Sequence, residues 1–205
     1  MLSEIRIYAE GGGDRKDSKQ QIRCGFGEFL RELRDLARQR RIHWRIIAAG
    51  PRNSAFDDFM TALETHPDAF NVLLVDSEAA VNTAPWEHLA QRDGWRVTNV
   101  PADHCHFMVQ SMEAWLIADV DALERFYGPN LQKSCIPDNP NVEEIDKERL
   151  ESALKDATRN TQKGCYHKIR HAAKLLELVN PDTVRSKATH CERLFTTINR
   201  LLSES

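Results

Sequence analysis

The chain has 205 residues, of which 41% are hydrophobic and 29% charged, and its formal net charge is −3. This composition is typical of a globular protein with one sizeable domain, or a domain with an appendage. The negative balance excludes a protein that binds nucleic acid through its overall charge, but not one with a local basic face. No stretch approaches the roughly 20 apolar residues of a membrane span.

Two further features concern the cellular compartment. The start of the chain, Met1-Leu2-Ser3-Glu4, lacks the basic and apolar regions of a signal peptide, so we expect a cytoplasmic protein. The cysteines are scattered and form no C-x-x-C pair, which predicts free, mostly buried thiols rather than disulfides or a zinc site. They are Cys24, Cys105, Cys135, Cys165 and Cys191.

Strands and helices alternate in the first half of the chain. An apolar run predicts a strand over residues 4–9, and apolar residues at helical spacing predict an amphipathic helix over 18–41. A second strand follows over 44–48, and a helix begins at Ser54. A third strand covers 71–75, and Pro85 suits the first turn of a third helix that ends near residue 91.

The pattern changes after a fourth strand predicted over 95–100 and a possible fifth over 107–109. Ser111 precedes a helix over 112–117, residues 128–141 are rich in Pro and Asn, and helical segments follow near 146–159, 164–179 and 188–202. Alternating strands and helices predict an α/β fold with a parallel sheet flanked by helices. We predict an α/β domain over residues 1–120 and a helical C-terminal extension over 121–205 packed on it.

Two acidic clusters stand where predicted strands end. Glu10 and Asp14 flank three glycines after the first strand, and Asp76 and Glu78 follow the third. Because ligands bind at the carboxyl ends of strands in open parallel sheets, we expect these acids to meet at one edge. Carboxylates gathered without matching cations typically hold a hard divalent metal. The alternative is that each acid caps a helix or meets solvent.

Glu113 lies among apolar neighbours, in Ser111-Met112-Glu113-Ala114-Trp115. A buried acid needs a partner or a metal to offset the cost of leaving water. Glu113 is therefore either a third acidic arm of the same site or the partner of an arginine.

The order of these acids resembles the Toprim domain of topoisomerases, bacterial primases and OLD-type nucleases. The likeness rests on Glu10-Gly11-x-x-Asp14, on Asp76-x-Glu78 and on the isolated Glu113, and it covers about residues 4–120. Segments 73–78 and 108–115 are most similar to small bacterial Toprim-like proteins encoded beside ABC/SMC-type ATPases in phage-defence loci. In two places the chain departs from the OLD-type pattern, which usually has Glu at Asp14 and Asp at Glu78.

The resemblance implies a Toprim-like fold, a nucleic acid substrate, an ABC/SMC-type ATPase partner and possible homo-oligomers. It also implies one or two Mg²⁺ (or Mn²⁺) ions, with a role for Glu10 in metal binding or proton transfer. OLD-like enzymes use a lysine late in the domain, for which Lys168 and Lys163 are the candidates. The metal ligands implied are Glu10, Asp14, Asp76, Glu78 and Glu113.

Phosphodiester cleavage by such a site is chemically reasonable. Metal ions held by carboxylates neutralise phosphate charge and make a water nucleophilic, and a lysine stabilises the developing negative charge. The backbone N–H groups of Gly11, Gly12 and Gly13 are suited to cradle a phosphate oxygen, as glycine-rich turns before helices do. Without the Lys-Ser/Thr of a P-loop, these glycines do not form an ATP site.

Weaker signals come from basic and histidine residues. Arginines cluster on and after the first long helix, where we favour a solvated face over a phosphate contact. His104 with His106, and His167 with His171, have spacings that can ligate zinc, but no third partner matches them.

Three functions therefore remain open. The first is a Mg²⁺-dependent Toprim-like nuclease that acts as the effector subunit of an ATPase in anti-phage defence. The second is a non-catalytic module that binds the ATPase through the same scaffold. The third is a metal-dependent phosphatase or phosphotransferase with Asp76 as nucleophile.

Overall fold

A computed structural model gives the structure of the protein and describes residues 2–204. Four strands form one parallel sheet in the order β2-β1-β3-β4. The inner strands are apolar and buried on both faces, as parallel strands covered by helices require. The strands are β1 (Glu4–Glu10), β2 (His43–Gly50), β3 (Phe70–Asp76) and β4 (Cys105–Met108).

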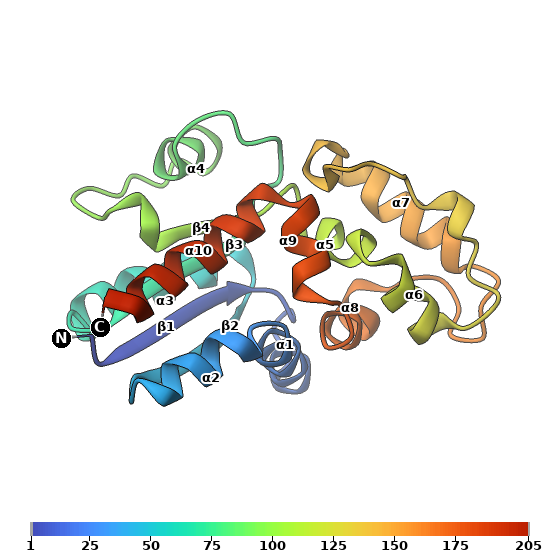
Figure 1. The fold of residues 1–205 in the computed structure, drawn as a ribbon. Helices are drawn as coiled ribbons and strands as arrows, with labels where there is room; N and C mark the ends of the chain where they lie inside the picture. Colours follow the sequence, from blue (N-terminus) through green and yellow to red (C-terminus); the bar gives the residue numbers. More distant parts are fainter. Residues whose placement is uncertain (1, 205) are drawn as a thin grey trace.

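Ten α-helices flank this sheet within the described residues, which confirms the predicted α/β class (Figure 1). They are α1 (Lys16–Phe29), α2 (Arg31–Gln39), α3 (Arg52–Thr65), α4 (Pro85–Asp93), α5 (Met112–Ala118), α6 (Val120–Tyr127), α7 (Lys147–Thr158), α8 (Lys168–Leu176), α9 (Pro181–Lys187) and α10 (Thr189–Glu204). Short 3-10 turns occupy Ala102–His104, Lys133–Cys135 and Val142–Glu144.

The structure corrects two predicted elements. The single helix over 18–41 is two helices, because the chain bends at Leu30 and lets α2 turn its own apolar residues to the core. Residues 95–100 form no strand: Trp95 instead stacks on Phe56 of α3, with ring centroids 4.2 Å apart. The edge of the sheet is taken by β4, which overlaps the possible strand over 107–109.

The sequence patterns did not predict two helices, α6 and α9. Each of them begins at a residue whose side chain caps the helix. Asp119 accepts a hydrogen bond from the N–H of Ala122 in the first turn of α6, and Asn180 caps α9 in the same way. Such caps satisfy N–H groups that have no partner inside the helix. These caps start two short helices in segments where the apolar spacing predicts none.

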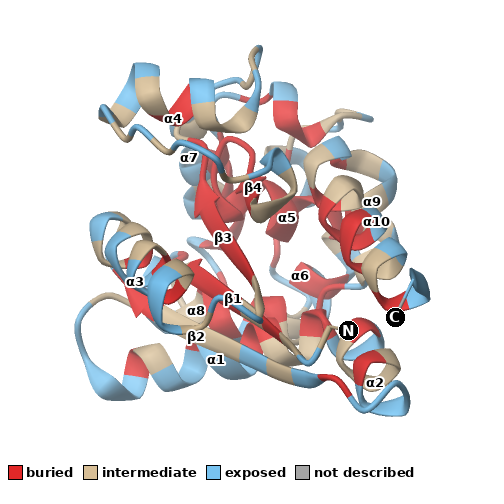
Figure 2. Ribbon diagram, turned by 90° about the vertical axis from the view of Figure 1, so that its left-hand side faces the viewer, coloured by how far each residue is buried: buried red, intermediate tan, exposed pale blue. Residues whose placement is uncertain are grey.

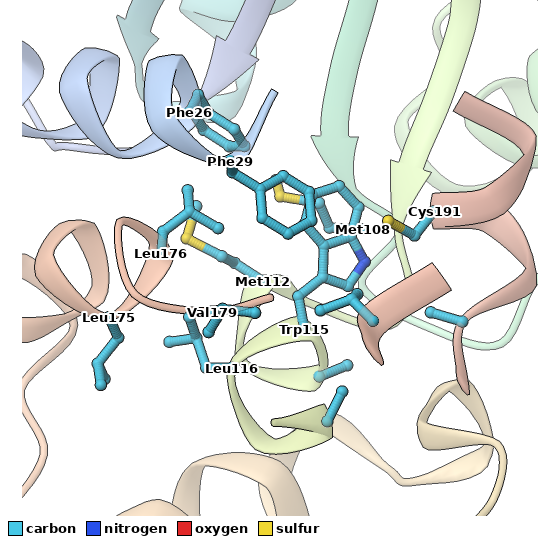
Figure 3. Close-up of a cluster of buried hydrophobic side chains, with 14 of the residues drawn as sticks. Phe26, Phe29, Met108, Met112, Trp115, Leu116, Leu175, Leu176, Val179 and Cys191 are labelled. Carbon is cyan, nitrogen blue, oxygen red and sulfur yellow. The ribbon is translucent and has the colours of Figure 1, made fainter. Parts of the chain in front are cut away.

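Side chains that alternate along each strand divide the interior into two apolar cores, one on each face of the sheet. Figure 2 shows β3, β4 and α5 as almost wholly buried. The larger core joins the N-terminal and C-terminal halves. Trp115 stacks on Phe29 of α1 (Figure 3), with ring centroids 5.1 Å apart, and Phe29 also meets Phe195 of α10 edge-on. The division at residue 120 remains a prediction, but the extension shares this core.

The cysteines and the apolar content of the helices are the last features of the fold. All five cysteines are free as predicted, but the expectation that most are buried is wrong, since only Cys105 and Cys191 are buried. Cys24 and Cys165 are exposed, and Cys135 is half-buried against the larger core. Among residues 2–204, no helix combines the length and the apolar content that crossing a membrane requires.

Candidate functional site

The site lies at the carboxyl edge of the sheet. Glu10 ends β1 and Asp76 ends the neighbouring strand β3, so the parallel pairing brings the two acids together. A carboxylate oxygen of Glu10 accepts the backbone N–H of Asp76 at 3.1 Å. Glu78 follows in a turn, with a φ of 66°. Ligand oxygens of Glu10, Asp76 and Glu78 all lie within 4.8 Å of one another, a group that could hold a metal ion.

Asp76 is the most constrained of these acids. Its side chain is 2% exposed, and both of its carboxylate oxygens are bonded. One oxygen accepts the N–H of Met112 at 2.8 Å, at the start of α5, and the other accepts a hydrogen bond from Lys168 Nζ at 3.1 Å. Burial raises the pKa of Asp76, and the neighbouring Lys168 offsets part of that rise.

Glu113 joins the site from α5 through Lys168. Lys168 Nζ lies 3.4 Å from one Glu113 oxygen, and the hydroxyl of Tyr166 donates to the other at 2.9 Å. Burial acts to raise the pKa of Glu113, but Lys168 and Tyr166 outweigh it and hold that pKa below its ordinary value. Glu113 thus pairs with a lysine rather than with the arginine that its sequence context suggested.

Lys168 begins α8 and places its ammonium group between two buried carboxylates. Its own burial opposes the charge, yet Asp76 and Glu113 raise the pKa of Lys168 above its ordinary value. The other lysine candidate lies elsewhere, because Lys163 Nζ sits over the ring of Phe126 at 4.7 Å. The structure therefore brings Lys168, and not Lys163, to the acids.

Arg52, at the start of α3, is the main site residue that the sequence patterns missed. It donates to both carboxylate oxygens of Asp93, at 2.7 and 3.1 Å, and to the backbone carbonyl of Asp76. It also lies 3.4 Å from Glu10, and its guanidinium group stacks over Trp95 at 5.0 Å. One sequence feature could have identified Arg52: it directly follows the Gly50-Pro51 break at the end of a predicted strand.

Two further cations contact Glu78, the most accessible acid of the three. Lys147 Nζ, at the start of α7, donates to a Glu78 oxygen, and Arg92 lies 3.5 Å from the same oxygen. The other carboxylate oxygens of Glu10 and Glu78 accept no hydrogen bond from the part of the chain that the structure describes. Each of these two acids thus keeps one oxygen for a ligand.

Asp14 does not join this group. It is exposed beyond the glycine turn, and it makes no hydrogen bond or ion pair with any residue between 2 and 204. The glycines themselves do line the site: together with Gly50, Met112 and Lys168 they border a cavity of about 170 Å³ that reaches Glu10 and Asp76. A Cβ atom on Gly12 would lie 2.8 Å from the carbonyl oxygen of Ser18, so this turn needs glycine.

Glu10 is a buried acid that lies close to a second acid, Asp76. Burial and the nearby Asp76 raise the pKa of Glu10 to about 7, although Arg52 acts in the opposite direction. A carboxyl group with such a pKa exchanges its proton near neutral pH. Carboxylates that repel one another in this way, with oxygens free on two of them, are chemically suited to a hard cation such as Mg²⁺.

The histidine pairs do not form a comparable site. His106 is fully buried, where burial and Arg193 lower its pKa to about 3, and its Nε2 lies 2.9 Å from the carbonyl of Asp103. His171 lies 2.9 Å from the hydroxyl of Tyr127. Within residues 2–204, no group of three potential metal ligands includes a histidine.

Comparison with known proteins gives one match. A family model described as a domain of unknown function, DUF4276, matches residues 9–199. No curated protein and no solved structure matches the chain. The matched region begins just before Glu10 and includes all the site residues described above.

Proposed function

We propose that this chain, which belongs to the DUF4276 family, is a Mg²⁺- or Mn²⁺-dependent Toprim-like nuclease of the cytoplasm. It hydrolyses phosphodiester bonds of nucleic acid as the effector subunit of an ABC/SMC-type ATPase in bacterial anti-phage defence. The observation that carries the proposal is the meeting of Glu10, Asp76 and Glu78 at the carboxyl edge of a parallel sheet. The ATPase partner and the defence role rest on the sequence resemblance.

Each residue of the site has a role in this reaction. Glu10, Asp76 and Glu78 hold the metal, which when bound neutralises phosphate charge and lowers the pKa of a water. Alternatively, Asp76 and Glu78 would hold the metal, and Glu10 would accept a proton from the attacking water through its carboxylate oxygen that accepts no hydrogen bond from the described residues. Lys168, held by Asp76 and Glu113, supplies positive charge beside the leaving oxygen.

The glycine turn supplies the remaining contact. Gly11, Gly12 and Gly13 have φ angles of 130°, 84° and 59°, and an added Cβ atom on Gly12 would meet the carbonyl oxygen of Ser18 at 2.8 Å, so the turn requires glycine at this position. Successive backbone N–H groups in such a turn bind anions, and these glycines border the cavity at Glu10. We assign them to a non-bridging phosphate oxygen of the substrate.

The geometry favours this reaction over an aspartyl-phosphate mechanism. A nucleophilic aspartate needs a free oxygen that faces the substrate. Both oxygens of Asp76 accept a hydrogen bond, from Met112 and Lys168, and the side chain is 2% exposed, so a remaining lone pair can bind a metal ion but no oxygen faces a substrate for in-line attack on phosphorus. The non-catalytic alternative lacks a reason for burying three acids and a lysine together, since such groups cost stability unless they serve a site.

The test measures metal binding and cleavage in the same preparations. Wild-type protein, with Mn²⁺ or Mg²⁺ and its ATPase, should cut labelled DNA or RNA, and Mn²⁺ should raise its melting temperature. Glu10→Gln and Asp76→Asn should each reduce cleavage by a factor of at least about 100, as loss of a metal ligand or general base does. The exposed Asp58→Asn is the matched control and should cut at the wild-type rate.

Two results would contradict the proposal. One is cleavage by a Glu10→Gln, Asp76→Asn double variant at the wild-type rate, which would mean a contaminating nuclease. The other is an unchanged melting temperature with millimolar Mn²⁺ together with intact DNA and RNA, which would favour the non-catalytic module.

A further inference from the structure

A basic groove runs beside the edge strand β2, outside the site already described. It lies between β2 and α1 and has a volume of about 540 Å³. Five of the side chains that line it are cations, and none of the lining residues that the structure describes is acidic. The cations are Arg6, Lys16, Lys19, Arg23 and Arg45. For a chain with a net charge of −3, this is a marked local excess of positive charge.

Most of this charge is not neutralised by acids. Arg6 and Arg45 share a single carboxylate, that of Glu4, at 3.1 and 2.6 Å. Lys19 donates to the carbonyl of Ala49, and Arg23 donates to Gln20, so neither meets an acid. Lys16 has no ion-pair partner among residues 2–204. The groove is thus lined by about four uncompensated charges.

Of these cations, only Arg45 belongs to the arginine cluster that the sequence suggested. On α2, Arg31 is paired with Glu28, and both Arg34 and Arg38 with Asp35, as on a solvated helix face. The groove instead combines residues of β1, α1 and β2, which no local pattern brings together.

The groove and the acidic cavity lie next to each other at Lys19 and Gly50. Lys19 Nζ donates to the carbonyl of Ala49 at 2.6 Å, and the next residue, Gly50, borders the cavity at Glu10 and Asp76. A Cβ atom on Gly50 would lie 2.7 Å from the carbonyl of Gly13 and 3.0 Å from Lys19 Nζ. The space over Gly50 is therefore filled by the backbone of Gly13 and the side chain of Lys19, so a cation of the groove stands directly beside a residue that borders the acidic cavity.

The floor of the groove is apolar and includes an aromatic ring. Trp44 and Ile46 line it from β2, and the indole Nε1 of Trp44 has no hydrogen-bond partner within the described chain. Cations beside an aromatic face are typical of sites that bind single-stranded nucleic acid, where phosphates meet the cations and bases or sugars pack on the ring.

We propose that this groove binds a single strand of nucleic acid beside the acidic site. The inference rests on the proposed nuclease function and specifies its substrate as a single strand. The regular spacing of phosphates fits a row of cations, whereas an acidic peptide would not require an aromatic floor.

The experiment measures binding without cleavage, in full-length protein with EDTA. A fluorescent single-stranded oligonucleotide is titrated with wild type and with a Lys16→Glu, Arg23→Glu double variant. Both side chains are exposed, so the fold should persist, and circular dichroism checks this. We expect at least about tenfold weaker binding at low salt, and a log–log salt slope reduced by about 1.4, from two lost phosphate contacts at ~0.7 each.

The matched control is a Lys155→Glu, Arg159→Glu double variant on α7. It makes the same charge change at two exposed residues that do not line the groove, and it should bind like the wild type. Equal weakening by both double variants would mean attraction by net charge alone and would overturn the groove. Tighter binding of a duplex, or equal binding of polyglutamate, would overturn the single-strand assignment.

The groove and the nuclease reaction can fail separately. If the Lys16→Glu, Arg23→Glu double variant does not bind the oligonucleotide, and no metal condition gives cleavage by the wild type, the groove is confirmed and the nuclease function is contradicted. If the wild type cleaves and the groove variant cleaves and binds equally well, the groove falls and the nuclease function stands.

Discussion

Glu10 shows how strongly the position of one residue sets its chemistry. It ends a strand whose neighbour ends in Asp76, so it is buried beside another acid, and its pKa rises from 4.5 to about 7. An acid whose pKa is raised by folding binds its proton more tightly in the folded state. Its contribution to the free energy of unfolding is therefore lost as the pH rises from about 4.5 through 7.

This reasoning predicts a pH-dependent effect of Glu10→Gln in the absence of metal. Below about pH 4.5 the variant and the wild type should have similar free energies of unfolding, because Glu10 is protonated in both states. At pH 8 the variant should be more stable by about 1–3 kcal/mol, because the neutral amide avoids burying a charge beside Asp76. Urea unfolding at the two pH values, with EDTA present, measures the difference.

The control for this experiment is Glu64→Gln, an exposed acid of α3, which should show no such pH dependence. A Glu10→Gln variant that is less stable than the wild type at pH 8 would mean that Arg52 and the Asp76 N–H stabilise the Glu10 carboxylate more than its burial costs.

Lys168 illustrates the same point for a cation. The side chain is 47% exposed, but its ammonium group touches Asp76 and Glu113, which are 2% and 4% exposed. These acids are 92 and 55 residues away in sequence. The role of such a residue therefore depends on the position of the helix that carries it.

At the scale of elements, the packing of α8 on α1 is what brings Lys168 to the sheet edge. The two helices approach closely at Gly25, where an added Cβ atom would lie 2.8 Å from the backbone oxygen of Ala173. A backbone atom cannot turn aside as a side chain can, so any larger residue must push the helices apart.

Gly25→Val should therefore reduce the free energy of unfolding by about 2 kcal/mol, the typical cost of overpacking a filled site. Gly27→Ala, on the same helix, is the control: nothing lies within 4 Å of its added Cβ atom, so it should gain about 0.5–1 kcal/mol from helix propensity. Chemical denaturation of both variants tests the pair. Equal stability of the two would show that α1 and α8 separate at little cost.

For the molecule as a whole, the C-terminal helices complete the larger core. Phe29 of α1 contacts both Trp115 of α5 and Phe195 of α10. Leu176 of α8 lies in the same cluster as Phe29 and Trp115 (Figure 3). A core that loses two of these four side chains exposes large apolar surfaces on α1 and on the sheet.

A chain that ends at residue 120 should therefore fail to unfold cooperatively, and it should expose apolar surface to a hydrophobic dye. Far-ultraviolet circular dichroism during urea titration, against the full chain, measures cooperativity. A sharp unfolding transition of the 1–120 fragment would instead show that the α/β part folds alone, with the extension as a separate cover.

The fold class and part of the site could be predicted without the structure. The apolar runs that end at Glu10 and Asp76 indicate parallel strands, and parallel strands present their carboxyl ends at one edge. The helix over 18–41 and the strand over 95–100 were wrong because a bend at Leu30 and the stacking of Trp95 on Phe56 depend on partners far away in sequence.

The sequence by itself determined which residue types stand at strand ends: an acid after β1, an acid after β3 and glycines between strand and helix. Only the tertiary structure decided which of them meet. It left Asp14 in solvent, brought Lys168 between Asp76 and Glu113, and placed Arg52 against Glu10. The physical reason is that strand periodicity acts over neighbouring residues, whereas ion pairs between helices depend on how distant apolar faces pack.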